Sequence, residues 1–379
     1  MMPIYVPAML LGIPAQASLV LLPLYVLHLG ESPAAAASII GLRALGMMAM
    51  DIPAGMLAAR FGDKTIMLAA IAALTMSHAA FALSNEIWLL YVIAFFYGAG
   101  GSSFLLGRMS YMTDTLAAAD RGRAIAMIAG SMRAAALIGP ALGAVLAQRM
   151  GYHVAFFVSA FLAASSWFCV KHFAVPEKSQ QDYVPLSKVV EIGKIHARVF
   201  ATAGTGAVLF MLLRSARTVM VPLVGASLNL DTETIGLIVS VSAAVDVAMF
   251  YPAGLIMDKY GRRATAVPSS ILFTVALGLL ALANDYWSLL GVAAFLGFAN
   301  GLSTGIVMTL GTDLAPPSQR AGFLGIWRLL TDFGTSAGPM VVGAIVTSAP
   351  LATAALSVAG LGTLGCVIVY RYVEETLPG

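Results

Sequence analysis

Long apolar segments alternate with short polar connections along most of the chain. Each apolar segment has about 20 residues or more, which is the length that an α-helix needs to cross the hydrocarbon core of a bilayer. Twelve such segments predict twelve transmembrane helices. They are expected at residues 4–28, 33–59, 65–83, 87–112, 122–149, 151–172, 197–226, 232–258, 264–283, 286–311, 319–348 and 350–371.

The two halves of the chain repeat one pattern of residues. Trp88 and the pair Gly139-Pro140 recur, shifted by 199 positions, as Trp287 and Gly338-Pro339. Six helices in each half is an even number, so both halves cross the membrane in the same sense and form a parallel repeat. We therefore predict an all-α membrane protein of two six-helix bundles, residues 1–173 and 197–379.

A polar stretch, residues 174–196, joins the two predicted bundles. Its apolar positions alternate with Lys188, Glu191 and Lys194, which fits a short amphipathic helix on the inner leaflet. A simple tether is the alternative.

Composition indicates that lipid is the solvent of this chain. Hydrophobic residues make up 60% and charged residues 10% of it, whereas soluble domains carry about 25% charged residues. The formal charge of +3 gives no sign of nucleic-acid binding, because the basic residues lie in short loops. Cys169 and Cys366 lie inside apolar segments, so we expect packing residues and neither a disulfide nor a metal site.

The position of basic residues in the connections predicts the orientation of the helices. One side of the membrane receives only Arg149. The other side receives Arg60, Lys64, Arg121, Arg123, Lys171, Lys178, Lys188, Lys194, Arg198, Lys259, Arg262, Arg263, Arg320 and Arg371. We therefore expect both termini and the linker on the cytoplasmic side of the inner membrane.

The connection that follows residues 232–258 carries a motif. It reads Gly-Leu-Ile-Met-Asp-Lys-Tyr-Gly-Arg-Arg over residues 254–263 and resembles the loop signature of the major facilitator superfamily. The first half has a related motif over residues 55–64, in which Ala59 stands where the family has an acid and Asp63 where it has a base. The glycines permit a tight turn, and the acid suits a helix N-terminus. The resemblance implies a latch that holds the two halves together, formed by Gly254, Asp258, Lys259, Gly261, Arg262 and Arg263, with Gly55, Arg60 and Gly62 in the first half.

A second motif, Gly-Pro-Ala-Leu-Gly at residues 139–143, resembles part of the antiporter signature of the family's exporters. Small residues also let membrane helices approach closely. Helix packing is therefore the alternative interpretation of this motif.

Charged residues inside the predicted helices are expensive, at about 2.5–3.5 kcal/mol each near the bilayer centre. Away from the helix ends, nine lie there: Arg43, Asp51, Arg108, Arg133, Arg214, Arg217, Asp246, Arg328 and Asp332. None lies in the third, sixth, ninth or twelfth helix, which are the outer supports in the resembled fold. The charged residues are therefore expected around a central cavity.

In the resembled fold the second helix packs against the eleventh and the fifth against the eighth, and matched depth along these helices then implies three ion pairs of opposite charge. They are Asp51 with Arg328, Arg43 with Asp332, and Arg133 with Asp246. An i,i+4 pair of Arg328 with Asp332 is the competing arrangement. A buried carboxylate beside an arginine can take or release a proton, so Asp332, Asp246 and Asp51 are the candidates for proton coupling. His78 is expected to be a core histidine.

Arg214 and Arg217 lie three residues apart in the segment 197–226. If they face the cavity, the site favours an anion. The candidate cavity residues are Arg214, Arg217, Arg43, Arg133, Arg328, Gln16 and Asn300.

The sequence thus predicts a secondary transporter that works by alternating access. We expect proton-coupled export of a small amphiphilic organic compound, which is an anion if the arginines face the cavity. Proton symport of an organic anion into the cell is the alternative, and a receptor that does not transport is a remote one. Neither a zinc-protease motif nor a phosphate-binding loop occurs, so no enzyme activity and no cofactor are expected. The expected partners are the substrate, protons and the lipid bilayer, and we expect a monomer.

Overall fold

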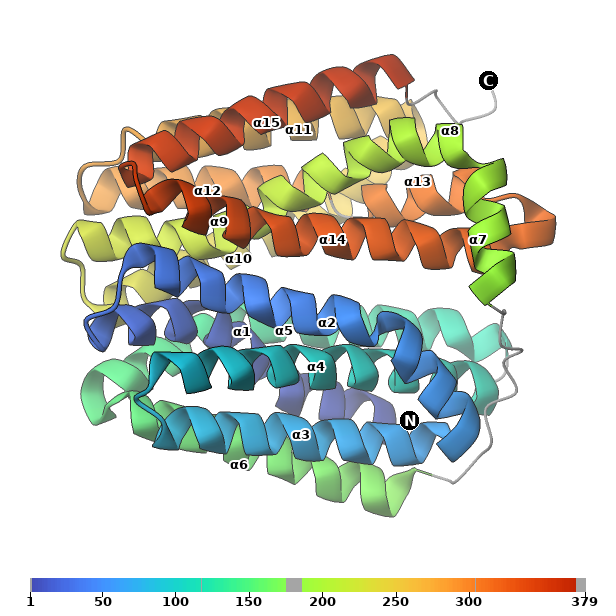
Figure 1. Ribbon diagram of the computed structural model, residues 1–379, viewed down its shortest axis with the longest axis horizontal. Helices are drawn as coiled ribbons and strands as arrows, with labels where there is room; N and C mark the ends of the chain where they lie inside the picture. Colours follow the sequence, from blue (N-terminus) through green and yellow to red (C-terminus); the bar gives the residue numbers. More distant parts are fainter. Residues whose placement is uncertain (1, 117, 175–185, 304, 373–379) are drawn as a thin grey trace. The chain divides into compact units, whose positions relative to one another are not determined.

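The computed structural model describes residues 2–116, 118–174, 186–303 and 305–372, which are all helices and short connections (Figure 1). Twelve helices in these residues are long and apolar enough to cross a membrane. The side chains of a few further residues, among them Arg121, Asp258 and Arg262, lie outside the described part. The predicted all-α membrane fold is confirmed.

The first half contains six long helices: α1 (Met2–His28), α2 (Pro33–Phe61), α3 (Asp63–Leu83), α4 (Ile87–Thr115), α5 (Ala118–Met150) and α6 (Tyr152–Phe173). A short helix, α7 (Leu186–Ile195), lies in the stretch for which an amphipathic helix or a tether was predicted. Residues 175–185 of that linker lie outside the described residues.

The second half contains α8 (Ala197–Val199), a π-helical turn at Phe200–Gly204, α9 (Thr205–Ser227), α10 (Thr232–Tyr260), α11 (Arg262–Leu280), α12 (Tyr286–Leu302), α13 (Ile306–Leu314), a 3₁₀ turn at Pro317–Gln319, α14 (Arg320–Val346) and α15 (Leu351–Tyr372). The bounds repeat those of the first half. Both ends of α10 lie 199 residues after the ends of α2, and both ends of α15 lie 199 residues after those of α6. Two identical shifts at helix ends are the structural counterpart of the sequence repeat.

The turns after α2 and α10 require glycine. Gly62 has φ of 84° and Gly261 has φ of 95°, which is a left-handed conformation that other residues rarely adopt. Gly55 and Gly254, in contrast, lie inside helices, and a Cβ built on either would meet no atom within 4 Å. The expected tight turn therefore explains Gly62 and Gly261 and is wrong for Gly55 and Gly254.

Glycines also bring helices into close contact at equivalent places in the two halves. A Cβ on Gly139 would lie 2.6 Å from the carbonyl oxygen of Ile13, so α5 crosses α1 almost backbone to backbone. A Cβ on Gly338 would lie 2.5 Å from the carbonyl oxygen of Leu212, so α14 crosses α9 in the same way. The Gly-Pro motif therefore has a packing role in both halves, and that role needs no relation to export.

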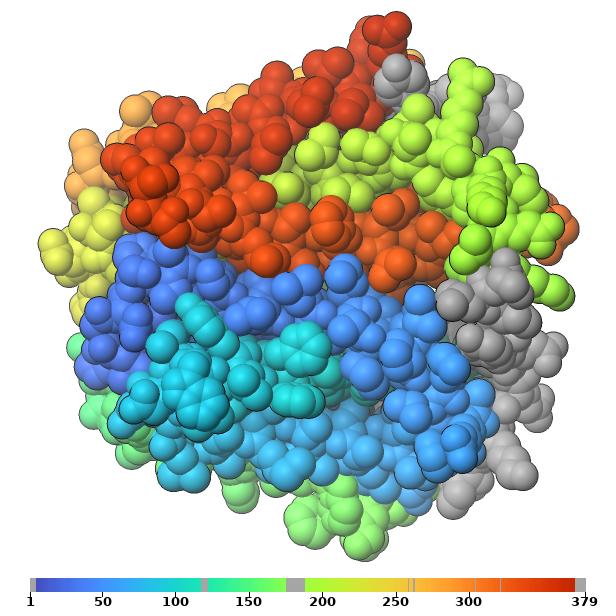
Figure 2. Space-filling model, viewed as in Figure 1, coloured from blue at the N-terminus to red at the C-terminus, as the bar shows by residue number. Residues whose placement is uncertain are grey.

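The chain forms two compact units. Unit 1 comprises Met1–Tyr183 with Asp231–Ser240, and unit 2 comprises Val184–Leu230 with Val241–Gly379. The first turns of α10 thus group with unit 1, where Glu233 and Arg149 form an ion pair of 2.9 Å. Figure 2 shows the surface that α2, α3 and α4 present in unit 1 and that α14 and α15 present in unit 2. Large side chains such as Phe161 remain exposed in the molecule (71%), as expected for helices that face lipid.

The continuous helix predicted over residues 286–311 is interrupted. α12 ends at Leu302 and α13 begins at Ile306. Gly305 has φ of 84°, which no right-handed helix accommodates. The buried hydroxyl of Ser303 donates to the carbonyl oxygen of Asn300 at 2.7 Å and satisfies one acceptor at the break. Broken membrane helices are a common feature of transporter sites.

Candidate functional site

A polar network joins three helices inside unit 2. The amide of Asn300 on α12 donates through Nδ2 to Oδ2 of Asp246 on α10, at 2.6 Å. Its Oδ1 accepts from Nε of Arg214 on α9, at 2.9 Å. Asn300 is 5% exposed, and it uses both ends of its amide to connect a carboxylate with a guanidinium group. Three of the predicted site residues therefore form one cluster.

Arg217 adds a second guanidinium group to this cluster. It lies one turn along α9 from Arg214. Two guanidinium groups and one carboxylate leave the cluster with an excess of positive charge. Nε of Arg214 bonds a side chain, that of Asn300, and not a backbone carbonyl.

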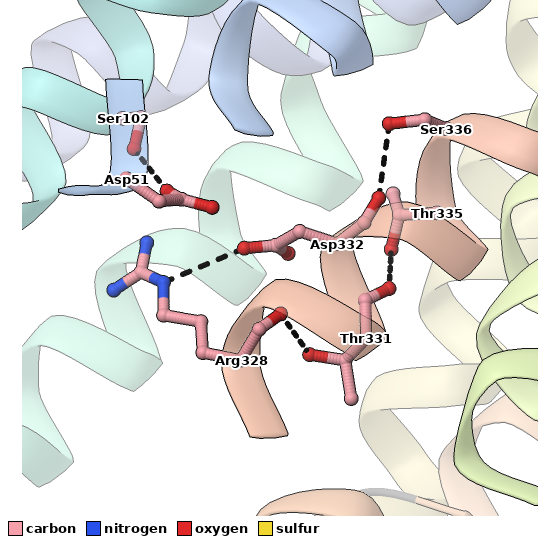
Figure 3. A network of polar contacts seen from close by, with 7 residues as sticks. All are labelled: Asp51, Ser102, Arg328, Thr331, Asp332, Thr335 and Ser336. Atoms are coloured by element: carbon pink, nitrogen blue, oxygen red, sulfur yellow. Dashed lines mark hydrogen bonds and ion pairs between the residues drawn. The ribbon is translucent and has the colours of Figure 1, made fainter. Parts of the chain in front are cut away.

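A second charged group of unit 2 lies on α14. Nε of Arg328 lies 3.4 Å from Oδ2 of Asp332 (Figure 3). This is the i,i+4 arrangement, and the two side chains are 33% and 24% exposed. The neighbouring hydroxyls bond within the helix: Thr331 donates to the carbonyl oxygen of Arg328 at 2.8 Å, and Ser336 donates to that of Asp332 at 2.9 Å.

Ser336 also lies in the sequence Gly334-Thr335-Ser336-Ala337-Gly338, which matches the Gly-x-Ser-x-Gly pattern of serine hydrolases. In those enzymes the serine lies on a sharp turn between a strand and a helix. Here it lies in the middle of α14, and its hydroxyl donates to a backbone carbonyl. The same pattern recurs at residues 301–305, where the hydroxyl of Ser303 likewise donates to a backbone carbonyl.

The predicted charged site residues of unit 1 each contact a different group of that unit. Asp51 on α2 accepts a hydrogen bond of 2.5 Å from the hydroxyl of Ser102 on α4 (Figure 3). The guanidinium of Arg43 lies over the ring of Tyr97, 5.4 Å from its centroid. Arg133 donates to a carbonyl of its own helix at 3.4 Å. Sequence reasoning missed Ser102 and Tyr97, because neither a hydroxyl nor a phenol stands out in a membrane helix.

Gln16 lies where α1 meets α5, since a Cβ on Gly139 would be 2.9 Å from its Cβ. The three ion pairs predicted from depth each join residues of different units, so they stay predictions. They are Asp51 with Arg328, Arg43 with Asp332, and Arg133 with Asp246.

Basic residues of the predicted latch contact aromatic rings within their own units. Lys259 lies 5.2 Å from the ring centroid of Tyr260, and Arg263 lies 4.5 Å from that of Tyr370. Arg60 lies 5.2 Å from the ring centroid of Phe61. The side chains of Asp258 and Arg262 lie outside the described part, so the latch stays a prediction.

Comparison with known families identifies the fold. The family model described as Major Facilitator Superfamily matches residues 6–204 and, a second time, residues 203–379. The chain belongs to the major facilitator superfamily. It is therefore an integral membrane protein with many membrane-spanning helices and a transport role, and the resemblance noted in the loop motif is confirmed.

Curated members of the superfamily are similar to parts of the chain. A hexuronate transporter of Bacillus subtilis is 26% identical over 163 residues, which cover 43% of this chain and 38% of that protein. The multidrug resistance protein MdtH of Yersinia pestis is 22% identical over 303 residues, which cover 79% of this chain and 74% of that protein.

Solved structures of superfamily members share the fold over nearly the whole chain. The nucleoside transporter NupG has a TM-score of 0.80 at 13% identity, and the match covers 98% of each chain. A D-xylose-proton symporter has a TM-score of 0.75 at 15% identity, and the match covers 99% of this chain and 98% of that one. At these identities the likeness concerns the fold alone.

Proposed function

We propose that the protein transports a small organic anion together with protons, in the same direction, and that the cluster of Arg214, Arg217, Asn300 and Asp246 binds both. The single observation that carries the proposal is the bridge through Asn300. Of the two transport functions considered from the sequence, this is the symport alternative. We expect it to work by alternating access in the inner membrane, with both termini cytoplasmic.

Arg214 has donors left for a ligand. A guanidinium group carries five N–H donors, and Nε is the atom that bonds Asn300. The two terminal nitrogens then offer a planar pair of donors, which matches a carboxylate or phosphate better than any ammonium group does. The hydrogen bond from Nε to Asn300 holds the guanidinium group, so that the ligand meets a side chain whose position is already fixed.

Asp246 competes with the substrate anion for the same positive charge. When Asp246 is ionised, it partly neutralises Arg214 and Arg217. When it is protonated, the arginines are left for the ligand, and anion binding is stronger. Thermodynamic reciprocity then requires that a bound anion also promotes protonation of Asp246.

This linkage determines the direction of coupling. Ligands that promote each other's binding occupy the same conformational state and cross the membrane together. An exchanger needs the opposite relation, in which substrate and proton exclude each other, and a cationic substrate at Asp246 would show it. An anion at this cluster therefore favours symport.

The relatives support an anionic substrate to a limited degree. The name of the Bacillus subtilis relative specifies a hexuronate, which is a sugar with a carboxylate group. The multidrug resistance relative covers more of this chain and favours the second candidate function, proton-coupled export. The Gly-Pro motif, which also suggested export, is accounted for by helix packing in both halves.

Transport by the purified full-length chain in proteoliposomes tests the proposal. The probes are glucuronate, glucose and glucosamine, which have similar shapes and carry a negative, no and a positive charge. We expect an inward proton gradient to drive accumulation of glucuronate, with little competition from the other two. Arg214→Gln should abolish accumulation, whereas Arg320→Gln, the same change at an exposed position, should not. Preference for glucosamine, or efflux driven by the same gradient, would overturn the proposal.

A further inference from the structure

His78 is a titratable group in the interior of unit 1 that the proposed function does not use. It lies on α3 and is 1% exposed. Its Nδ1 is 2.9 Å from the carbonyl oxygen of Leu74, one turn earlier in the same helix. Its Nε2 is 3.3 Å from the hydroxyl oxygen of Ser18 on α1. Both ring nitrogens thus have hydrogen-bond partners.

The chemistry of these partners determines where the protons lie. A carbonyl oxygen only accepts, so Nδ1 carries a proton and donates it to Leu74. The hydroxyl of Ser18 has one proton and donates it to the carbonyl oxygen of Pro14, at 2.8 Å. The hydroxyl oxygen can then only accept from Nε2. With the Ser18 hydroxyl turned to Pro14, both ring nitrogens carry protons, which is the charged form of histidine.

A neutral His78 requires a different arrangement of the same groups. With Nε2 unprotonated, the Ser18 hydroxyl must turn to donate to the ring, and the carbonyl oxygen of Pro14 loses that bond. Serine hydroxyls that bond the carbonyl four residues earlier tend to bend membrane helices, and Pro14 lies inside α1. The proton on His78 is thus connected to the backbone of α1.

Two further helices surround this pair. The ring of Tyr97 on α4 packs edge-on against His78, with centroids 4.8 Å apart, and the guanidinium of Arg43 on α2 lies over that tyrosine ring, 5.4 Å from its centroid. A positive charge near the ring disfavours a second positive charge on it, so Arg43 is the group on α2 that bears on this site. Among the described residues, α6 adds no charged or titratable group to these interactions.

The repeat provides an internal comparison. The positions of the second half that correspond to His78 and Tyr97 are Leu277 and Leu296, both fully buried. The same fold therefore accepts leucine at both places, and helix packing does not require the polar pair. Its presence in unit 1 alone indicates a role other than packing.

We propose that His78 and Ser18 form a proton-binding site in unit 1, separate from the Asp246 cluster, and that its occupancy alters the hydrogen bonding of α1. The site holds a proton when the pH is low and releases it as the pH rises. This inference does not depend on the charge of the substrate or on the direction of transport.

Nitrogen NMR of the full-length protein in lipid nanodiscs, with ¹⁵N-labelled histidine, tests this site. His78→Gln identifies the resonances by their loss. We expect both ring nitrogens of His78 to be protonated at low pH and Nδ1 alone at high pH. Ser18→Ala should demand about a tenfold higher proton concentration for half-protonation, and Arg43→Gln about a tenfold lower one. The ring-nitrogen resonances of His153, whose Nδ1 contacts the carbonyl oxygen of Ala82 at 2.6 Å, should be the same in all variants at any one pH and serve as the control.

A His78 ring that stays singly protonated throughout the pH range in which the protein remains folded would overturn the proposal. An unchanged titration in Ser18→Ala would also overturn it. If His78→Gln fails to fold, His78→Leu, which copies Leu277 of the second half, serves for the assignment. A glucuronate preference that fails in vesicles would refute the proposed function and leave this result unaffected.

Discussion

Replacing Asp246 by asparagine gives the most informative perturbation of the unit 2 cluster. The change keeps the shape of the side chain and removes its negative charge, as protonation would. The variant should therefore bind an anion as the protonated wild-type protein does, at every pH. Its affinity for glucuronate should exceed that of the wild type at high pH and match it at low pH.

The size of the effect follows from the geometry. Two hydrogen bonds of 2.9 and 2.6 Å, joined by one amide group, connect Arg214 to the Asp246 carboxylate. A ligand carboxylate on Arg214 therefore lies about 8–10 Å from Asp246, given ordinary bond lengths. At an effective dielectric constant of about 20, two like charges at that distance repel by about 2 kcal/mol. Since Asp246 is partly exposed, solvent screening reduces this to about 1–2 kcal/mol, or about five- to thirtyfold in Kd.

Equilibrium binding of radiolabelled glucuronate to detergent-solubilised protein at several pH values measures this difference. We expect the wild-type Kd to rise with pH and the Kd of Asp246→Asn to stay constant. Glu86→Gln, which neutralises an exposed carboxylate in unit 1, should behave as the wild type. Weaker binding in Asp246→Asn, or a pH dependence that survives the change, would refute the competition between carboxylate and anion.

Three further predictions concern other parts of the structure. Asn300→Leu should weaken glucuronate binding about tenfold or more, because a buried guanidinium and a carboxylate each lose a hydrogen bond; an unchanged Kd would show that the bridge is dispensable. Gly139→Ala should destabilise the fold by about 1–3 kcal/mol in thermal unfolding through its clash with α1, whereas Gly130→Ala, which points into open space, should not. Hydrogen bonds from Ser288 hold the pKa of Asp285 below its usual range, so the cap that it gives α12 should persist at neutral pH and be lost as the pH falls through that lowered pKa; the protection of the first-turn amides of α12 against hydrogen exchange, corrected for the intrinsic rate at each pH, should then fall in acid, and equal protection at both pH values would contradict this.

Much of the fold follows from the sequence because its two strongest signals are physical requirements of a bilayer. Segment length and apolar composition determine which residues span, and the shift of 199 positions reappears at both ends of α10 and α15. The break between α12 and α13 was missed, because Gly305 is tolerated within an apolar run and only the backbone reveals its left-handed conformation.

The charged residues of the candidate site could be predicted from the sequence, but the hydrogen bonds that join them could not. Arg214, Arg217 and Asp246 stand out because charges in membrane helices are expensive. That Asn300 joins them depends on the packing of α9, α10 and α12, which no local pattern encodes. His78 was expected to be a satisfied core histidine, and it is buried with both nitrogens bonded. Whether the Ser18 hydroxyl donates to Pro14 or to His78 can be asked only when the positions of all three residues are known.

The proposed function requires that protons accompany the anion through the Asp246 cluster. Its most direct test is the internal pH of proteoliposomes, read from a trapped fluorescent dye, when glucuronate alone is added outside at equal pH on both sides. Proton symport predicts that the interior acidifies as glucuronate enters. It also predicts that Asp246→Asn still exchanges glucuronate without any acidification. An interior that becomes alkaline, or that stays at constant pH while wild-type protein accumulates glucuronate, would contradict it.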